Sequence, residues 1–167
     1  FNIIKLIPTY FLYFFYLMSD KIIFQTEEMK SDVLKYCHFL KKIKNVVKHN
    51  PLDTSIVDKL VTKNSIFNYP YIFAAGRLVE VKGFDLLINA FSLSNVKLTH
   101  KLVISGDGPE KKKLVNLVQK LKLSNKVIFT GFKENIYPLI KKTDLCIMSS
   151  RIEGFPNILN EMIYLND

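Results

Sequence analysis

Cysteine is scarce in this sequence, and the glycine pattern typical of dinucleotide-binding sites is missing from it. Cys37 and Cys146 lie far apart, so we expect neither a disulfide framework nor a metal site. Cys146 stands in an apolar run, which is typical of a small buried hydrophobic side chain. No Gly-x-Gly-x-x-Gly follows a strand candidate, which argues against a nicotinamide-dependent enzyme.

Acidic residues are outnumbered. The sequence has 24 Lys and Arg against 15 Asp and Glu, a net charge of +9. This excess suits anionic partners such as nucleotide phosphates, acidic lipid or nucleic acid. It equally suits a lysine-rich solvated surface, and the run Lys111–Lys113 is expected to face outward. Because no arginine-rich arm, zinc knuckle or aromatic RNA-binding signature is present, we expect no nucleic-acid partner.

Long apolar runs are also lacking. The uncharged, aromatic-rich segment 6–18 is shorter than the roughly 20 residues that cross a bilayer, and Pro8 interrupts it. We interpret it as a buried helix of a partly missing domain, with membrane-surface contact and a spanning helix as alternatives. The start at Phe1 rather than Met, and a helical pattern at 163–167 with no Gly or Pro after it, predict a piece of a longer protein.

Short apolar runs alternate with longer amphipathic ones, which predicts an α/β fold. In the first part, we expect strands at 21–25 and 45–48 with a helix at 26–40 between them. The polar stretch 49–53 contains a proline and is interpreted as a hinge. We therefore expect two domains, covering residues 1–50 and 51–167.

The second domain is expected to contain four strand–helix units. The expected strands are 71–75, 101–105, 126–130 and 144–148, and the expected helices are 55–61, 83–93, 109–121, 135–141 and one starting near 156. This alternation predicts a parallel sheet with helices on both faces. Such sheets bind ligands at the carboxyl ends of their strands, where small residues recur at Gly76, Gly106, Gly131 and Ser149. Each glycine taken alone also suits an ordinary tight turn.

Two groups of charged residues follow these strands. Glu153 stands in a loop, and Glu161 lies inside the helix that follows Gly154 and Pro156. The start of that helix offers free backbone N–H groups as an anion site, and an acid on each side suits the hydroxyls of a sugar or a ribose. On spacing alone, a surface acid and an acid paired with a lysine remain the alternative.

Arg77 and Lys82 form the second group. Arg77 leaves the end of a strand, and Lys82 comes just before a helix. A planar guanidinium and a compact ammonium beside a crevice suit a diphosphate. An exposed pair of bases remains the alternative.

From Tyr71 onward the chain resembles family 4 glycosyltransferases, which have the GT-B architecture of two facing Rossmann-like domains. The stretches that carry the resemblance agree in order and spacing, and they are Ala75-Gly76-Arg77-Leu78, Lys82 to Ile88, Gly106-Asp107-Gly108-Pro109, Val127 to Phe132, and Glu153 through Glu161. Asn50 to Asp53 looks like the family's interdomain link. Within the family, the chain most resembles bacterial enzymes that transfer hexose or N-acetylhexosamine units onto glycan or lipid-linked acceptors.

The resemblance implies a retaining transferase that uses a nucleotide diphosphate sugar, with UDP as the expected nucleotide, and needs neither a cofactor nor a metal. It implies that Arg77 and Lys82 bind the donor diphosphate, that Glu153 contacts the donor sugar, and that Glu161 holds the ribose hydroxyls. Further donor contacts are implied for Gly76, Gly154, Phe155, Asn157 and Ile158, and base contacts for Phe132 and Lys133. The catalytic group would be Arg77, Lys82 and Glu153.

The sequence departs from the family at both ends. Most of the amino-terminal, acceptor-side domain is missing, and His38, His49 and His100 do not match its histidine. The second domain also stops after its fourth strand. We therefore expect this piece to be inactive and to have an unfinished sheet edge. The alternative to an enzyme is a remnant that at most binds a nucleotide sugar. A cytoplasmic location is expected, with contact to the inner membrane face left open.

Overall fold

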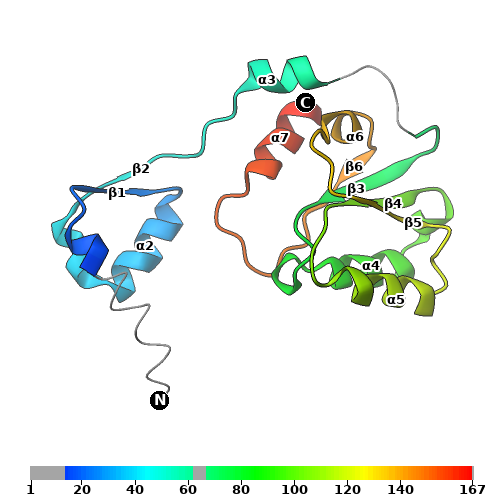
Figure 1. The fold of residues 1–167 in the computed structure, drawn as a ribbon, viewed down its shortest axis with the longest axis horizontal. Coiled ribbons are helices and arrows are strands. Elements are labelled where there is room, and N and C mark those ends of the chain that lie inside the picture. Colours follow the sequence, from blue (N-terminus) through cyan, green and yellow to red (C-terminus); the bar gives the residue numbers. More distant parts are fainter. Residues whose placement is uncertain (1–13, 62–66, 167) are drawn as a thin grey trace. The chain divides into compact units, whose positions relative to one another are not determined.

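The computed structural model describes residues 14–61 and 67–166. The chain divides into two compact units, Phe1–Pro51 and Leu52–Asp167, so the expected boundary after residue 50 lies one residue from the observed one (Figure 1). Most of the apolar segment 6–18 falls outside the described residues. Within the described ranges, no helix combines the length and the apolar character that crossing a bilayer requires.

The first unit contains a pair of parallel strands, β1 (Lys21–Phe24) and β2 (Lys44–Val47). Between them lie α2 (Glu27–Tyr36) and the 3-10 helix η1 (His38–Lys42). The single helix predicted over 26–40 is therefore wrong in its last part. Cys37 leaves the helical conformation, and the 3-10 turn that follows packs Leu40 with Ile22 and Phe24 in a small core. Burial of Leu40, which is 1% exposed, explains the break.

The second unit is built on a four-stranded sheet of β3 (Tyr71–Ala75), β4 (Lys101–Ser105), β5 (Val127–Gly131) and β6 (Leu145–Cys146). The spatial order is β5-β4-β3-β6, and every neighbouring pair is parallel, as the sequence predicts. The chain adds β4 and β5 on one side of β3 and then returns to place β6 on the other side. β6 is shorter than the expected strand 144–148.

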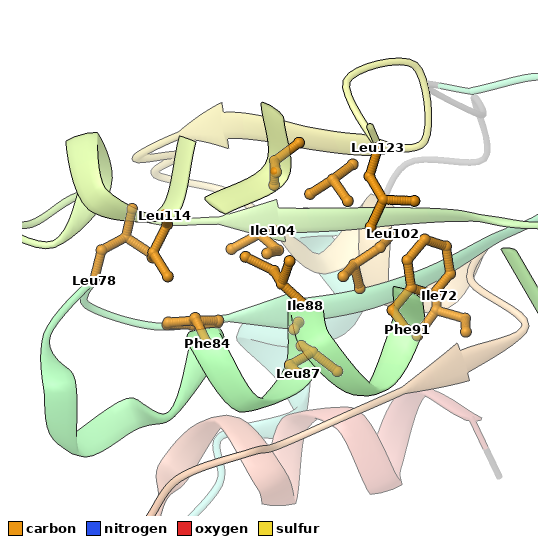
Figure 2. Close-up of a cluster of buried hydrophobic side chains, with 13 residues drawn as sticks. Ile72, Leu78, Phe84, Leu87, Ile88, Phe91, Leu102, Ile104, Leu114 and Leu123 are labelled. Atoms are coloured by element: carbon orange, nitrogen blue, oxygen red, sulfur yellow. The ribbon is translucent and has the colours of Figure 1, made fainter. Parts of the chain in front are cut away.

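Helices cover both faces of this sheet (Figure 1). One face carries α4 (Phe84–Leu93) and α5 (Lys111–Lys120), and the other carries α3 (Thr54–Leu60), α6 (Tyr137–Lys141) and α7 (Asn157–Asn166). Successive residues of a strand point to opposite faces, so Ile72 packs under α4 while Phe73 packs in the other core. Figure 2 shows the first core, where Phe84, Leu87 and Ile88 of α4 meet the sheet. The α/β fold with helices on both faces is confirmed.

The turn between β4 and α5 corrects one expectation. Pro109 was predicted in the first turn of the helix, but α5 begins at Lys111. The turn is held by the backbone of Leu78 instead, whose N–H donates to Asp107 O at 2.9 Å and whose carbonyl accepts from Glu110 N at 3.0 Å. These bonds fix residues 107–110 against the end of β3 before the helix starts.

Backbone groups meet directly where the strands end. Gly76 N donates to Ser105 O at 3.0 Å, and Gly106 N donates to Gly131 O at 2.8 Å. Gly106 has a φ of 138°, and a Cβ placed on it would lie 1.9 Å from the carbonyl oxygen of Gly76. The carboxyl edge of the sheet therefore depends on the absence of a side chain at Gly106.

Gly106→Ala should destabilise the protein more than Gly131→Ala does. Both glycines have positive φ, so each alanine carries a conformational cost of about 1–2 kcal/mol. Only Gly106 adds a clash with backbone, because nothing lies within 4 Å of a Cβ on Gly131. Urea unfolding would compare the two variants, and equal losses would contradict the observed packing of Gly106 on Gly76.

Candidate functional site

A cavity of about 520 Å³ opens at the carboxyl ends of β3, β4, β5 and β6. Its volume falls within the range of small-molecule sites. It lies where the strand order reverses beside β3, which is the usual ligand position in open parallel sheets. Its lining comprises Ala75, Gly76, Arg77, Lys82, Phe84, Ser105, Gly106, Asp107, Phe132, Lys133, Ile136, Ile147, Met148, Ser149, Ser150, Glu153 and Ile158.

Most of the residues predicted from the sequence line this cavity. The ones that do are Gly76, Arg77, Lys82, Phe132, Lys133, Glu153 and Ile158. The structure thus brings together segments that follow three different strands. The remaining predicted residues, Gly154, Phe155, Asn157 and Glu161, belong to the loop and helix beside the cavity and are not in its lining.

Lys82 and Glu153 form an ion pair at the cavity wall. The Lys82 ammonium donates to Glu153 Oε1, and the Ser150 hydroxyl donates to the same oxygen at 2.8 Å. The two charged side chains are 27% and 22% exposed. Partial burial of Glu153 acts to raise the pKa of its carboxyl group, but the hydrogen bonds from Lys82 and Ser150 outweigh it and leave the pKa below its ordinary value. Glu153 is therefore an ionised acceptor.

A second ion pair joins the loop after β6 to the start of α4. Arg151 Nη1 and Nη2 donate to the two carboxylate oxygens of Asp85 at 2.8 and 2.6 Å. Arg151 Nη1 also donates to the carbonyl oxygen of Glu80 at 2.7 Å. The bonds from Arg151 lower the pKa of Asp85. This two-point contact fixes the orientation of both side chains.

Glu161 lies one turn beyond Ile158 on α7. The Tyr137 hydroxyl donates to its Oε1 at 3.4 Å. Burial raises the pKa of the Glu161 carboxyl group above its ordinary value, and the bond from Tyr137 offsets only part of this effect. The surroundings thus shift the pKa values of Glu153 and Glu161 in opposite directions.

Sequence reasoning did not identify the Arg151–Asp85 pair or the role of Ser150. Asp85 lies 66 positions from Arg151, and no local pattern joins them. The only signal was indirect, because Ser149, next to Ser150, is one of the small residues expected at the strand ends. Residues 14–61 and 67–166 contain no group of three or more His, Cys, Asp or Glu side chains that could hold a metal ion. Independence from metal stays a prediction.

Comparison with known proteins identifies the family. Residues 58–166 match the family described as Glycosyl transferases group 1, and the chain belongs to this family. An uncharacterized glycosyltransferase of Methanocaldococcus jannaschii is 36% identical over 92% of this chain and 39% of its own length. An N-acetylgalactosamine-N,N'-diacetylbacillosaminyl-diphospho-undecaprenol 4-alpha-N-acetylgalactosaminyltransferase of Campylobacter jejuni is 32% identical over 69% of this chain and 31% of its own length.

Solved structures agree with this assignment at the level of the fold. The HepE protein of Anabaena, in complex with UDP, has a TM-score of 0.74 and 20% identity to this chain, and the match covers 88% of this chain and 43% of that one. The matches thus span between 31% and 43% of the length of these relatives. The fold expected from the resemblance, a GT-B type α/β unit, is confirmed.

The two glutamates should respond oppositely to replacement by glutamine. Because the pKa of Glu153 is lower in the folded state, its carboxylate contributes to the free energy of unfolding above the unfolded pKa near 4.5. This contribution is lost as the pH falls through the folded pKa. A raised pKa means that Glu161 contributes stability below 4.5 and loses it as the pH rises through its folded pKa.

Near pH 7, Glu153→Gln should therefore lower the free energy of unfolding, and Glu161→Gln should raise it. Both differences should shrink on acidification, when the wild-type carboxyl groups are protonated. Urea unfolding at a series of pH values measures them. If both variants changed the free energy of unfolding in the same direction near pH 7, the opposite pKa shifts of Glu153 and Glu161 would be contradicted.

Proposed function

We propose that this chain is the nucleotide-sugar-binding part of a retaining glycosyltransferase that uses a UDP-sugar. Its product would be a hexose or N-acetylhexosamine joined to a glycan or lipid-linked acceptor. The supporting observation is the cavity at the strand ends, which Arg77 and Lys82 line together with Glu153. Cations for phosphate and a carboxylate for hydroxyls are the groups that such a donor requires.

The ligand in a solved structure with the same fold supports UDP as the nucleotide. HepE of Anabaena, which shares the fold, is a UDP complex. In this chain, Arg77 and Lys82 would bind the diphosphate, while Phe132 and Lys133, which follow β5, would contact the base. The base would then lie at the β5 edge of the sheet, and the loop that carries Glu153 follows β6 at the other edge. Such an arrangement leaves the sugar near Glu153.

Charge development accounts for the proposed catalysis. When the bond from the sugar to the diphosphate breaks, negative charge grows on the leaving phosphate, and Arg77 and Lys82 would stabilise it in place. Lys82 has three N–H donors, so it is able to keep one bond to Glu153 while it binds a phosphate oxygen. The acceptor hydroxyl oxygen would form the new bond to the sugar carbon, and the leaving phosphate would accept the proton of that hydroxyl. No metal enters this scheme.

The acceptor proposal draws on one relative. The Campylobacter jejuni protein is named for a diphospho-undecaprenol acceptor. A lipid-linked acceptor of that kind would require the complete protein to work at a membrane surface. We therefore propose a cytoplasmic location at the inner membrane face.

Arg77→Ala combined with Lys82→Ala should weaken UDP binding at least about tenfold, because each charge-assisted bond to phosphate contributes roughly 1.5–3 kcal/mol. Lys112→Ala with Lys120→Ala is the matched control, since it removes the same charge from exposed positions on α5. Calorimetric titration with UDP measures both. If the two double variants lost UDP affinity equally, the net positive charge of the protein, and not the cavity, would account for nucleotide binding.

Glu161→Gln tests the ribose assignment. UDP should bind this variant about tenfold more weakly than the wild type, whereas 2'-deoxy-UDP should bind both alike, because it lacks the hydroxyl that the carboxylate would accept from. Competition titrations with the two nucleotides measure the difference. If both nucleotides lose affinity equally, Glu161 does not hold the ribose 2'-hydroxyl.

A further inference from the structure

The loop between β6 and α7 carries Glu153 and Ser150 to the cavity, and it has little regular structure of its own. Residues 147–156 form neither helix nor strand. The position of Glu153 therefore depends on the contacts that hold this loop. The described contacts lead mainly to one neighbour, the segment formed by the 3-10 helix η2 (Glu80–Lys82) and the start of α4.

Two hydrogen bonds and one close backbone approach dock the loop on this segment. Ser149 Oγ donates to Lys82 O at 3.0 Å, and Arg151 N donates to Val81 O at 2.8 Å. Gly83, with a φ of 63°, lies so close that a Cβ on it would be 2.1 Å from the Ser149 carbonyl oxygen. The loop and the η2 segment thus meet backbone to backbone, directly beside Lys82.

Arg151 then joins the two segments through its side chain. Its guanidinium binds the Glu80 carbonyl before Lys82 and the Asp85 carboxylate after it, so it bridges the turn that carries Lys82. Arg151 and Asp85 do not belong to the cavity lining, whereas Lys82 and Glu153 do. Both side chains are about one third exposed, at 33% and 34%, so the pair lies at the surface and outside the cavity lining.

We propose that Arg151 and Asp85 are positioning residues that hold the Lys82–Glu153 pair in the geometry needed to bind the donor. The inference rests on the proposed function of this cavity and adds two residues to it. A planar guanidinium satisfies Asp85 with two parallel bonds and still reaches the Glu80 carbonyl, whereas a lysine ammonium has no such fixed fork. The pair therefore fixes an orientation as well as a distance.

The pKa of Glu153 reports on this geometry without any need for activity. Its lowered value depends on hydrogen bonds from Lys82 and Ser150, and Arg77 and Lys133 are the other cationic side chains of the same cavity. If the loop shifts, these bonds lengthen and the pKa of Glu153 should rise. The pKa is measured from the carboxyl ¹³C resonance of the 167-residue chain during a pH titration.

Arg151→Lys and Asp85→Asn should each raise the pKa of Glu153 by about 0.5 or more and weaken UDP binding about tenfold. Arg151→Lys keeps the positive charge, so its effect reports geometry. Asp85→Asn removes a negative charge, which by electrostatics alone would lower the pKa of Glu153, so a rise can only come from lost positioning. The variant that combines Arg151→Lys and Asp85→Asn should lose little more UDP affinity than either single variant, because the two residues act as one pair.

Asp58→Asn is the control, because it removes a carboxylate that accepts from Tyr164 at 3.0 Å on the opposite face of the sheet. It should leave the pKa of Glu153 and UDP binding unchanged. The proposal is overturned if Arg151→Lys and Asp85→Asn lower stability but leave both measurements at wild-type values. If wild-type protein binds no UDP, the proposed function fails, and the Glu153 titration still decides the positioning role.

Discussion

β3 is the strand on which the second unit depends, because it is hydrogen-bonded on both sides and buried on both faces. Tyr71 to Ala74 are all buried, and the strand pairs with β4 over its whole length and with β6 on the other side. The Tyr71 hydroxyl, itself buried, donates to Leu139 O at 2.8 Å and ties α6 to the strand. Both helical layers and the carboxyl edge of the sheet take their positions from β3.

The site combines two kinds of support. Part of its lining is backbone at Gly76 and Gly106, where the ends of β3, β4 and β5 hydrogen-bond to each other. Its wall is a pair of irregular segments that hold each other through the Arg151–Asp85 contact. Rigid strands thus place the glycines, while side-chain bonds must place Lys82 and Glu153. The second kind of support is more sensitive to substitution, because one altered side chain removes it.

The fold was largely predictable from the sequence because its signals are local. The apolar run from Tyr71 to Ala75 gave the bounds of β3, and strand–helix alternation gave a parallel sheet with its cavity at the carboxyl ends. The helix over 26–40 failed because the buried contact of Leu40 is tertiary and leaves no mark on helical spacing. Arg151 was missed for the same reason, since its partner Asp85 is distant in sequence and each residue alone resembles a surface charge.

Net charge is a poor guide to how the cavity works. Its lining holds the cations Arg77, Lys82 and Lys133 and the carboxylates Asp107 and Glu153. A hydrogen bond from Lys111 lowers the pKa of Asp107, so this carboxylate, like Glu153, is ionised and paired. Free phosphate would be served by the cations alone. In the proposed function, the hydroxyls of a sugar diphosphate would donate to these paired carboxylates, so the selectivity of the cavity would reside in the balance of the two signs.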